Sequence, residues 1–293
     1  MSIDFDAAAI EQLRRHSYLP ASEVARLGGT DDQGLAPGWM AMLEQVLPLA
    51  ADRAQPPVSN YRVGSAALGQ RDAQHGAPSL YLGANLEVHG LPLNASVHAE
   101  QAATAHAWSR GEQGVLAVAA SAPPCGHCRQ FLCELGDPAD LAIVVPGDEP
   151  HTLEDLLPAA FGPDQLGVST HWMKTPFVGP GEGSEAAAQA IAAASFAPYS
   201  GVRAAVVLTL SSGAWVGGAS VESVAYNPSL GPMAMALSQL ALREPEQSAG
   251  SIEAAVLVES EGPISHFAAS EQVLRAVAPE LSLSRIALDD GTR

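Results

Sequence analysis

The chain opens with two helical patterns and changes to strand-like patterns after Pro57. Apolar residues recur at helical spacing over residues 6–13, and a second helical stretch over 38–47 begins just after Pro37. Neither stretch groups side chains that carry out chemistry. We therefore expect residues 1–47 to form a peripheral N-terminal helical segment.

A layered α/β domain is predicted for residues 48–171. Short apolar stretches typical of strands alternate there with helical stretches, and turn residues separate them. This alternation is typical of an α/β/α sandwich, in which helices cover a mixed sheet. The predicted order is strand 61–68, polar loop 70–78, strand 80–87, helix 96–108, strand 115–120, helix 125–135 and strand 141–145.

Two short motifs stand where the two predicted helices of this domain begin: His98-Ala99-Glu100 and Pro124-Cys125-Gly126-His127-Cys128. The imidazole of His98 and the thiolates of Cys125 and Cys128 are ligands that tetrahedral zinc prefers. Three protein ligands leave the fourth position for water, which distinguishes a catalytic zinc from a structural one. Glu100 has the chemistry of a general base for that water. We predict one zinc ion per chain, with Glu100 as the catalytic residue.

The helix starts explain how these residues meet. Residues two apart do not share a helix face, so His98 and Glu100 serve one site only from an irregular first turn. Cys125 and Cys128 are three apart and lie on one face. The N-terminus of a helix favours the thiolate over the thiol, which assists metal binding near neutral pH.

Two other interpretations of the cysteines explain less. A thiol–disulfide exchange centre accounts for Cys-Gly-His-Cys alone, but it leaves His98 and Glu100 without a role. A purely structural zinc site needs a fourth ligand, and the nearby candidates are Cys133 and His127. Cys133 lies in an apolar helix, and His127 points away from the metal if both flanking cysteines bind it. We interpret both as non-ligands.

The second half of the chain repeats the first. Residues 172–184 have the composition of a linker. Beyond them, residues 218–222 (Gly-Ala-Ser-Val-Glu) match residues 83–87 (Gly-Ala-Asn-Leu-Glu) at a spacing of 135. The same spacing places Met233-Ala234-Met235 opposite His98-Ala99-Glu100, and all three cysteines lie in the first copy. We expect residues 185–293 to form a degenerate, non-catalytic copy that lacks the metal site.

Charge and composition narrow the class of partner. The chain has 14 basic and 32 acidic residues, a net charge of −18, and therefore lacks the basic surface that binds polynucleotides. No apolar run reaches the length of a membrane span, and the acidic start does not resemble a signal peptide. Three cysteines, two of them assigned to a metal, suit a reducing compartment. We expect a cytoplasmic protein with a small-molecule substrate.

Taken with residues 83–87 and their repeat, the two motifs resemble the cytidine deaminase family in its long, two-domain form. The order H-x-E, then P-C-x-x-C, is the known signature of zinc-dependent base deaminases, and the resemblance covers nearly the whole chain. It implies a homodimer in which the second domain contributes to the neighbouring subunit's site. The substrate-binding residues that it implies are Asn85 and Glu87 for the ribose, Tyr61 against the nucleoside, the Ala99 backbone for the pyrimidine, Phe161, and Tyr226 across the dimer. Tyr61 and Tyr226 stand where phenylalanine is usual, which leaves the preference between ribose and deoxyribose open.

The predicted reaction is hydrolytic deamination of cytidine and deoxycytidine to uridine and deoxyuridine plus ammonia, a step of pyrimidine salvage. Zinc-bound hydroxide attacks C4, while Glu100 carries protons to ring N3 and to the departing amine. Another small nucleoside, a base or a nucleotide is an alternative substrate, and Arg129 near Cys128 keeps the nucleotide open. A non-catalytic, zinc-stabilised dimer is the alternative from another class. Glu222 is expected to keep only a structural hydrogen-bonding role.

Overall fold

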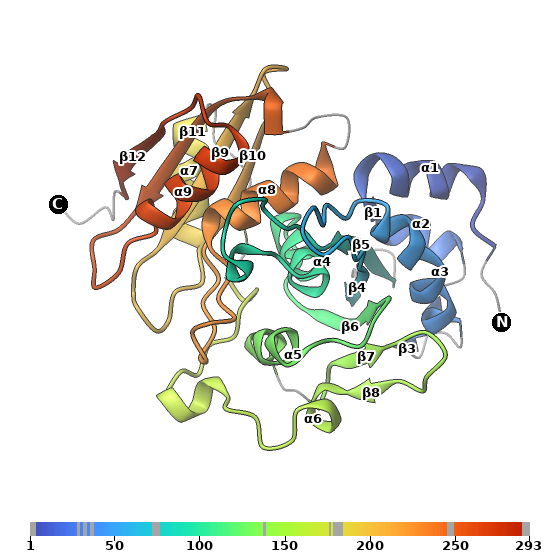
Figure 1. Ribbon diagram of the computed structural model, residues 1–293. Helices are drawn as coiled ribbons and strands as arrows, with labels where there is room; N and C mark the ends of the chain where they lie inside the picture. Colours follow the sequence, from blue (N-terminus) through green and yellow to red (C-terminus); the bar gives the residue numbers. More distant parts are fainter. Residues whose placement is uncertain are drawn as a thin grey trace.

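Two mixed sheets organise the chain in the computed structural model (Figure 1). The structure describes residues 4–27, 30–31, 34–35, 38–71, 77–136, 139–175, 177, 184–244 and 249–288. The first sheet has the order β1 (Tyr18–Leu19), β5 (Pro78–Ala84), β4 (Gly64–Arg71), β6 (Val115–Ala120), β7 (Ala142–Val144) and β8 (His151–Thr152). The second has the order β10 (Trp215–Ala219), β9 (Ala204–Leu210), β11 (Ile252–Glu259) and β12 (Leu283–Ala287).

The two sheets share one pattern of strand directions. β5 pairs antiparallel with β4, β4 antiparallel with β6, and β6 parallel with β7. The four strands of the second sheet repeat these directions in the same order. A parallel pair needs a crossover, which α5 (Gly126–Leu132) supplies in the first copy and α9 (Phe267–Val277) in the second. The predicted duplicated α/β fold is thereby confirmed.

Helices cover both faces of each sheet and approach closely at glycines. α4 (Ala99–Ser109) lies so near β5 that a Cβ on Gly83 would stand 2.1 Å from the backbone nitrogen of Ala103. α8 (Pro232–Arg243) lies equally near β10 at Gly218. On the opposite faces lie α3 (Trp39–Ala51) and α7 (Ser184–Ala194), against β4 and β10 respectively. The two inner helices, α4 and α8, contact each other and join the copies (Figure 1).

The N-terminal segment is more than a peripheral addition. α1 (Ala7–His16), capped by Asp6, is followed by β1, which pairs with β5, and by α2 (Ala21–Arg26). Side chains of this segment form a second hydrophobic core with α3 and the outer face of the first sheet; among them are Leu13, Leu19 and Val24. The predicted boundary at 47/48 falls inside α3, which occupies in the first copy the place that α7 occupies in the second.

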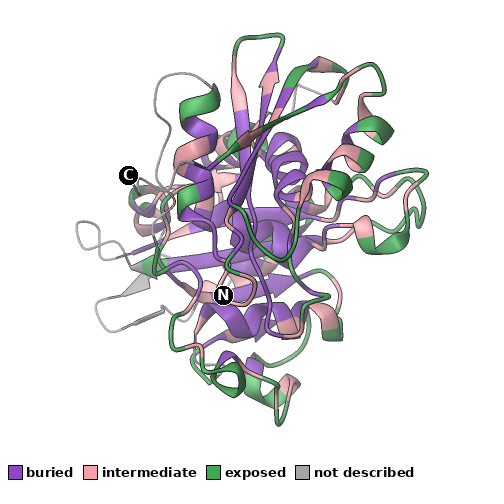
Figure 2. Cartoon of the chain, turned by 90° about the vertical axis from the view of Figure 1, so that its left-hand side faces the viewer, coloured by how far each residue is buried: buried purple, intermediate pink, exposed green. Residues whose placement is uncertain are grey.

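The main core runs through both copies without a break. Figure 2 shows buried residues along the strands and inner helices. Trp172 packs edge-on against Trp108 and Phe131, and both Trp172 and Met173 are buried. The start of the predicted linker is therefore core, because its large apolar side chains close the first copy. Residues 176 and 178–183 of that linker lie outside the described residues.

The remaining elements are short. They are β2 (Thr30–Asp31), β3 (Gly34–Leu35), α6 (Leu153–Leu156) and single 3-10 turns at Leu93–Ala95, Cys133–Leu135, Pro163–Leu166 and Ala249–Ser251. No helix within the described residues has the length and apolar character needed to cross a membrane.

Candidate metal centre and active site

His98, Cys125 and Cys128 meet at the starts of two helices. His98 immediately precedes α4 with extended backbone dihedrals, and Cys125 holds the same place before α5. Nδ1 of His98 lies 3.4 Å from Cys125 Sγ and 3.3 Å from Cys128 Sγ, and the two sulfurs are 3.7 Å apart. Among the described residues, this is the one group of three or more such side chains placed to share a metal ion.

The spacing of the three ligand atoms fits zinc. A Zn–S bond of about 2.3 Å at tetrahedral angles separates two sulfurs by about 3.8 Å, close to the separation observed. An imidazole and two thiols are also the donor types that zinc prefers over calcium or magnesium. The three residues can therefore hold zinc with little rearrangement, and they leave a fourth position open.

The three ligand groups polarise one another. The sulfur atoms of Cys125 and Cys128 are hydrogen-bonded to each other, and this contact, followed by that with His98, lowers the pKa of Cys125 to about 3. The contact with Cys125 in turn raises the pKa of His98 and that of Cys128. At neutral pH the group therefore holds a thiolate, which is the form of cysteine that binds metals.

Glu100 lies beside the ligand group in the first turn of α4. Its side chain is only 5% exposed, and the loss of hydration on burial raises its pKa above the ordinary carboxyl value. A buried carboxyl group of raised pKa next to metal ligands is a candidate proton carrier. Its neighbour Ala99 is buried in the same turn.

A cavity of about 310 Å³ opens over these residues, a size within the range of small-molecule sites. From the two motifs its lining includes His98, Ala99, Glu100 and Cys125. Tyr61, Asn85 and Glu87 line it as well, so four of the six predicted substrate-binding residues, counting Ala99, meet here. Residues that the sequence analysis did not assign also line it: Ser59, Val63, Ser96, Val97, Ala122 and Pro123.

Asn85 lies in the cavity wall and fixes the strand start opposite it. Its Oδ1 accepts a hydrogen bond from the Val63 N–H over 2.8 Å, and its Nδ2 donates to the Tyr61 carbonyl over 2.9 Å. The side chain therefore holds the backbone that carries Tyr61, whose own side chain is 61% exposed. A structural role and a place in the cavity coexist in this residue.

Glu87 receives three hydrogen bonds from the turn at 57–60. The N–H groups of Val58 and Ser59 donate to its Oε2, both over 2.9 Å, and the Ser59 hydroxyl donates to its Oε1. Burial alone raises the pKa of Glu87, but these bonds outweigh it and leave the pKa lowered. An ionised carboxylate thus lines the cavity. The sequence contains a pattern that could have identified Ser59 as a residue of the site, because Pro-x-Ser occurs at 57–59 and again at 198–200 in the second copy.

Phe161 and Tyr226 do not line this cavity in the chain described. Phe161 is 47% exposed, and its carbonyl accepts a hydrogen bond from Gln130 over 2.7 Å. Tyr226 is 65% exposed and lines a different cavity, in the second copy, beside Tyr199 and Glu222. Both aromatic side chains are therefore open to solvent on the single chain.

Sequence comparison places this site in a known family. A family model for the cytidine and deoxycytidylate deaminase zinc-binding region matches residues 39–144, and a second model with the same description matches 153–271. The cytidine deaminase of Vibrio vulnificus (strain CMCP6) is 40% identical over 248 residues, which cover 83% of this chain and 81% of that protein. The chain belongs to the cytidine deaminase family.

Other members of the family give a similar picture. The cytidine deaminase of Shewanella sp. (strain MR-4) is 41% identical over 253 residues, covering 85% of this chain and 82% of that protein. The crystal structure of cytidine deaminase from Mycobacterium tuberculosis is 35% identical, covers 41% of this chain and 95% of its own, and has a TM-score of 0.36. The first family match contains His98, Cys125 and Cys128. Zinc is the metal of this site, and the chain is a zinc-dependent enzyme of this family.

The second deaminase copy keeps the carboxylate of the first. Glu222 accepts hydrogen bonds from the N–H groups of Tyr199, over 2.8 Å, and Ser200, over 3.0 Å, and from the Ser200 hydroxyl. This is the set of donors that Glu87 receives in the first copy. The carboxylate closes a turn in both copies, as expected for a structural role of Glu222.

The expected register of the second copy is wrong by two residues at the helix start. A Cβ on Gly83 would meet Ala99 and Ala103, whereas one on Gly218 would meet Pro232 and Ala236, which gives a spacing of 133. The bridges Leu86–Val97 and Val221–Leu230 agree with this spacing. Gly231, not Met233, therefore stands opposite His98, and Met233 stands opposite Glu100, because the connection after Glu222 is two residues shorter.

The cysteine motif has a counterpart that sequence reasoning missed. The N–H of Gly64 donates to the Ser121 hydroxyl, and the N–H of Arg203 donates in the same way to the Ser260 hydroxyl. The cysteine motif begins three residues after Ser121, and Pro263-Ile264-Ser265-His266-Phe267 begins three residues after Ser260. Proline and histidine occupy the same positions in the two motifs, but Ile264 and Phe267 replace the two cysteines. The copy cannot hold the same metal.

Proposed function

We propose that this chain deaminates cytidine and deoxycytidine by hydrolysis, yielding uridine and deoxyuridine plus ammonia, as a step of pyrimidine salvage. The observation that carries the proposal is the buried Glu100, which lines one cavity with His98 and Cys125, two of the three residues placed to share a metal ion. A structural zinc site has no use for a buried carboxyl group next to an open coordination position. Relatives that share 40% or more of the sequence carry the name cytidine deaminase.

Glu100 is the proton carrier in this proposal. Held by its three ligands, zinc would act as a Lewis acid and lower the pKa of the water molecule bound to it to about 7. Glu100 takes a proton from the water and delivers it to N3 of the pyrimidine, which makes C4 electrophilic. After the water oxygen has attacked C4, Glu100 takes up the second proton of that oxygen and passes it to the amine, which leaves as ammonia when the C4–N bond breaks. Burial supports this role, because it raises the pKa of Glu100 and so favours the uptake of a proton by this carboxylate.

The walls of the cavity are proposed to hold the nucleoside. A carboxylate has about four acceptor positions, and the turn at 57–60 occupies three of those on Glu87. The remaining position suits a ribose hydroxyl, with Asn85 next to it. Tyr61 packs on the nucleoside, and the backbone of Ala99 at the helix start contacts the pyrimidine.

A nucleoside fits this site better than a nucleotide. Arg129, the cation that keeps a nucleotide open in the sequence, donates from Nε to the Pro124 carbonyl over 2.8 Å and from Nη1 to the Leu156 carbonyl over 2.7 Å. Its guanidinium therefore supports the cysteine turn, and it does not line the cavity. The net charge of −18 further disfavours a polyanionic substrate.

We also propose a cytoplasmic homodimer in which Phe161 and Tyr226 complete a cavity. Both aromatic side chains are exposed on the single chain and lie outside its own cavity, as required of residues that act across an interface. Tyr226 has a positive φ of 63°, and its N–H donates to the Ser223 carbonyl over 2.8 Å. This strained turn holds the ring outward. Sedimentation as a monomer would refute the cross-subunit role.

Ultraviolet-monitored turnover of zinc-loaded protein tests the proposed reaction. Cytidine, deoxycytidine, cytosine, CMP and adenosine are compared side by side, and the first two alone are expected to react. Glu100→Gln keeps the shape of the side chain, so we expect it to retain zinc and to lose about 100-fold to 10,000-fold in turnover. Turnover close to the wild-type rate in that variant would exclude the proton carrier. Silence on every substrate, with zinc still bound, would favour the non-catalytic dimer.

A further inference from the structure

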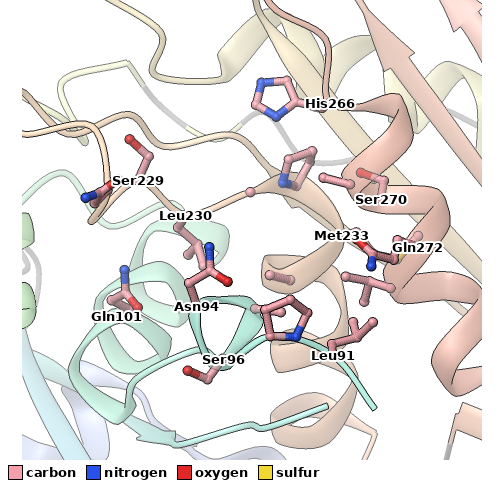
Figure 3. A pocket seen from close by; sticks show the side chains of 18 of the residues that line it. Leu91, Asn94, Ser96, Gln101, Ser229, Leu230, Met233, His266, Ser270 and Gln272 are labelled. Atoms are coloured by element: carbon pink, nitrogen blue, oxygen red, sulfur yellow. The ribbon is translucent and has the colours of Figure 1, made fainter. Parts of the chain in front are cut away.

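Two buried polar side chains join the zinc-bearing helices to one loop of the second copy, residues 223–230. Gln101 on α4 donates from Nε2 to the Pro228 carbonyl over 2.8 Å. Glu134, which follows α5, accepts from the Val224 N–H over 2.7 Å. Figure 3 shows Gln101 at the edge of a cavity between the copies, on the side where Ser229 and Leu230 of this loop lie.

Each of the two side chains is also tied to a helix that carries metal ligands. Gln101 Oε1 accepts from the backbone N–H of His98 over 3.2 Å, so the amide links the metal ligand to the loop directly. Glu134 stands in the 3-10 turn that continues the cysteine helix, and its backbone carbonyl accepts from Trp172 N–H over 2.7 Å. Gln101 is 1% exposed and Glu134 is fully buried. Buried groups of this kind are costly to leave without partners.

The loop is itself well fixed. The Ser223 N–H donates to the Ser229 hydroxyl over 2.9 Å, and a bridge between Val221 and Leu230 closes the base of the loop. The second copy adds one more contact, because the Tyr199 hydroxyl donates to the other oxygen of Glu134 over 2.7 Å. One stiff element therefore contacts both zinc-bearing helices through hydrogen bonds of ordinary length.

We propose that Gln101 and Glu134 are positioning residues, through which loop 223–230 fixes the helix start of His98 relative to the cysteines. Metal ligands carried on separate helices need such support, because a site that is loose by a fraction of an ångström binds its metal less well. The second copy has no equivalent of the Gln101 contact, because the residue of α8 opposite Gln101 is Ala234, whose methyl group cannot form a hydrogen bond. The metal-free copy thus serves the zinc site of its own chain. This inference rests on the ligand set of the proposed function.

The test uses the zinc-loaded full chain and three substitutions. Gln101→Met removes both hydrogen bonds of the side-chain amide and keeps a side chain of similar size. Glu134→Gln places an amide NH₂ against one of two donors. Ser109→Ala is the matched control, because Ser109 sits at the other end of α4 and also bonds the second copy, through Gln239 over 3.0 Å. The readouts are the rate of zinc release to a chromophoric chelator and the absorption spectrum of the cobalt-substituted protein.

We expect zinc release to be about tenfold faster in Gln101→Met and Glu134→Gln, the lower end of what losing a ligand's support costs. Their cobalt bands should shift, whereas Ser109→Ala should match the wild type in both readouts. If Glu134→Gln fails to fold, Tyr199→Phe removes one donor to Glu134 from within the second copy and should still accelerate release. Release rates equal to wild type in Gln101→Met and Tyr199→Phe would overturn the proposal.

Equal acceleration in Ser109→Ala would also overturn it, because any contact between the copies would then suffice. Failure of the proposed function is distinguishable from either result. It would show as a zinc-loaded wild-type protein that turns over neither cytidine nor deoxycytidine, a result that leaves the comparison of zinc release rates intact.

Discussion

The carboxylates Glu87 and Glu222 make it possible to measure substrate binding separately from structural support. Each accepts hydrogen bonds from two successive N–H groups and a serine hydroxyl. Of the two, only Glu87 lines the cavity that is also lined by the metal ligands His98 and Cys125. Glu222 is 7% exposed, whereas Glu87 is more open to water. The substitutions Glu87→Gln and Glu222→Gln are therefore a matched pair with different expected costs.

The magnitudes follow from the contacts. A glutamine keeps one oxygen for the two N–H donors and turns its amide toward the serine oxygen, so the main loss is the charge. A hydrogen bond to a charged group contributes about 1.5–3 kcal/mol and one to a neutral group about 0.5–1.5 kcal/mol. We expect Glu222→Gln to lower the free energy of unfolding by about 1–2 kcal/mol, and Glu87→Gln by less, because water competes there.

Substrate binding should rank the pair in the opposite order. A ribose hydroxyl that loses a charged acceptor costs about 1.5–3 kcal/mol, which corresponds to a rise in KM of about 10-fold to 100-fold for Glu87→Gln. Glu222→Gln should leave KM unchanged. Urea unfolding followed by fluorescence gives the first quantity, and initial rates with cytidine give the second. An unchanged KM in Glu87→Gln, or an equal rise in both variants, would refute the ribose-binding role.

Two further predictions concern stability. Gly83→Ala forces a Cβ to within 2.1 Å of the Ala103 nitrogen, so we expect the free energy of unfolding in urea to fall by at least about 1–3 kcal/mol. Gly126→Ala is the control, because its added Cβ meets open space and should not change that free energy measurably. Equal effects would contradict the close packing of α4. Burial holds the pKa of His106 well below its usual value, and the Arg110 Nε–H donates to its Nε2, so the unfolded chain binds a proton below about pH 6.5 that the native protein does not. The free energy of unfolding should therefore fall by up to about 1.4 kcal/mol per pH unit below that point. Urea unfolding at a series of pH values from about 7.5 to 5 measures this dependence, and His106→Gln should weaken it. An equal dependence on pH in the variant and the wild type would refute the reasoning.

Local patterns in the sequence were enough to predict the metal group and the main elements. Zinc ligands follow from residue type and helix starts, both of which are local, so His98, Cys125 and Cys128 meet as expected. The strand predicted at 115–120 has these bounds as β6. The strand predicted at 61–68 begins only at Gly64, because the backbone of Tyr61 and Val63 is hydrogen-bonded to the distant side chain of Asn85.

Long-range contacts account for what the sequence did not indicate. The spacing of 133 at the second helix depends on a connection two residues shorter, which only the packing at Gly83 and Gly218 reveals. The helix predicted over 125–135 ends as a 3-10 turn at Cys133–Leu135, where Glu134 bonds the second copy. No periodicity in the sequence indicates that contact. The proposed placement of Tyr226 across a dimer likewise depends on a second chain.

The short strand β1 has a consequence for the tendency of the protein to aggregate. In the six-stranded sheet both edge strands, β1 and β8, are only two residues long. β1 covers β5, whose seven residues are almost all apolar and buried, and Ser17 extends the cover by accepting from the Leu82 N–H over 2.8 Å. A bare apolar strand of that length is a template for pairing with other chains. Loss of the first 19 residues would therefore expose β5 and favour aggregation, although none of these residues lines the cavity of the metal site. The N-terminal segment thus protects the sheet edge from pairing with other chains.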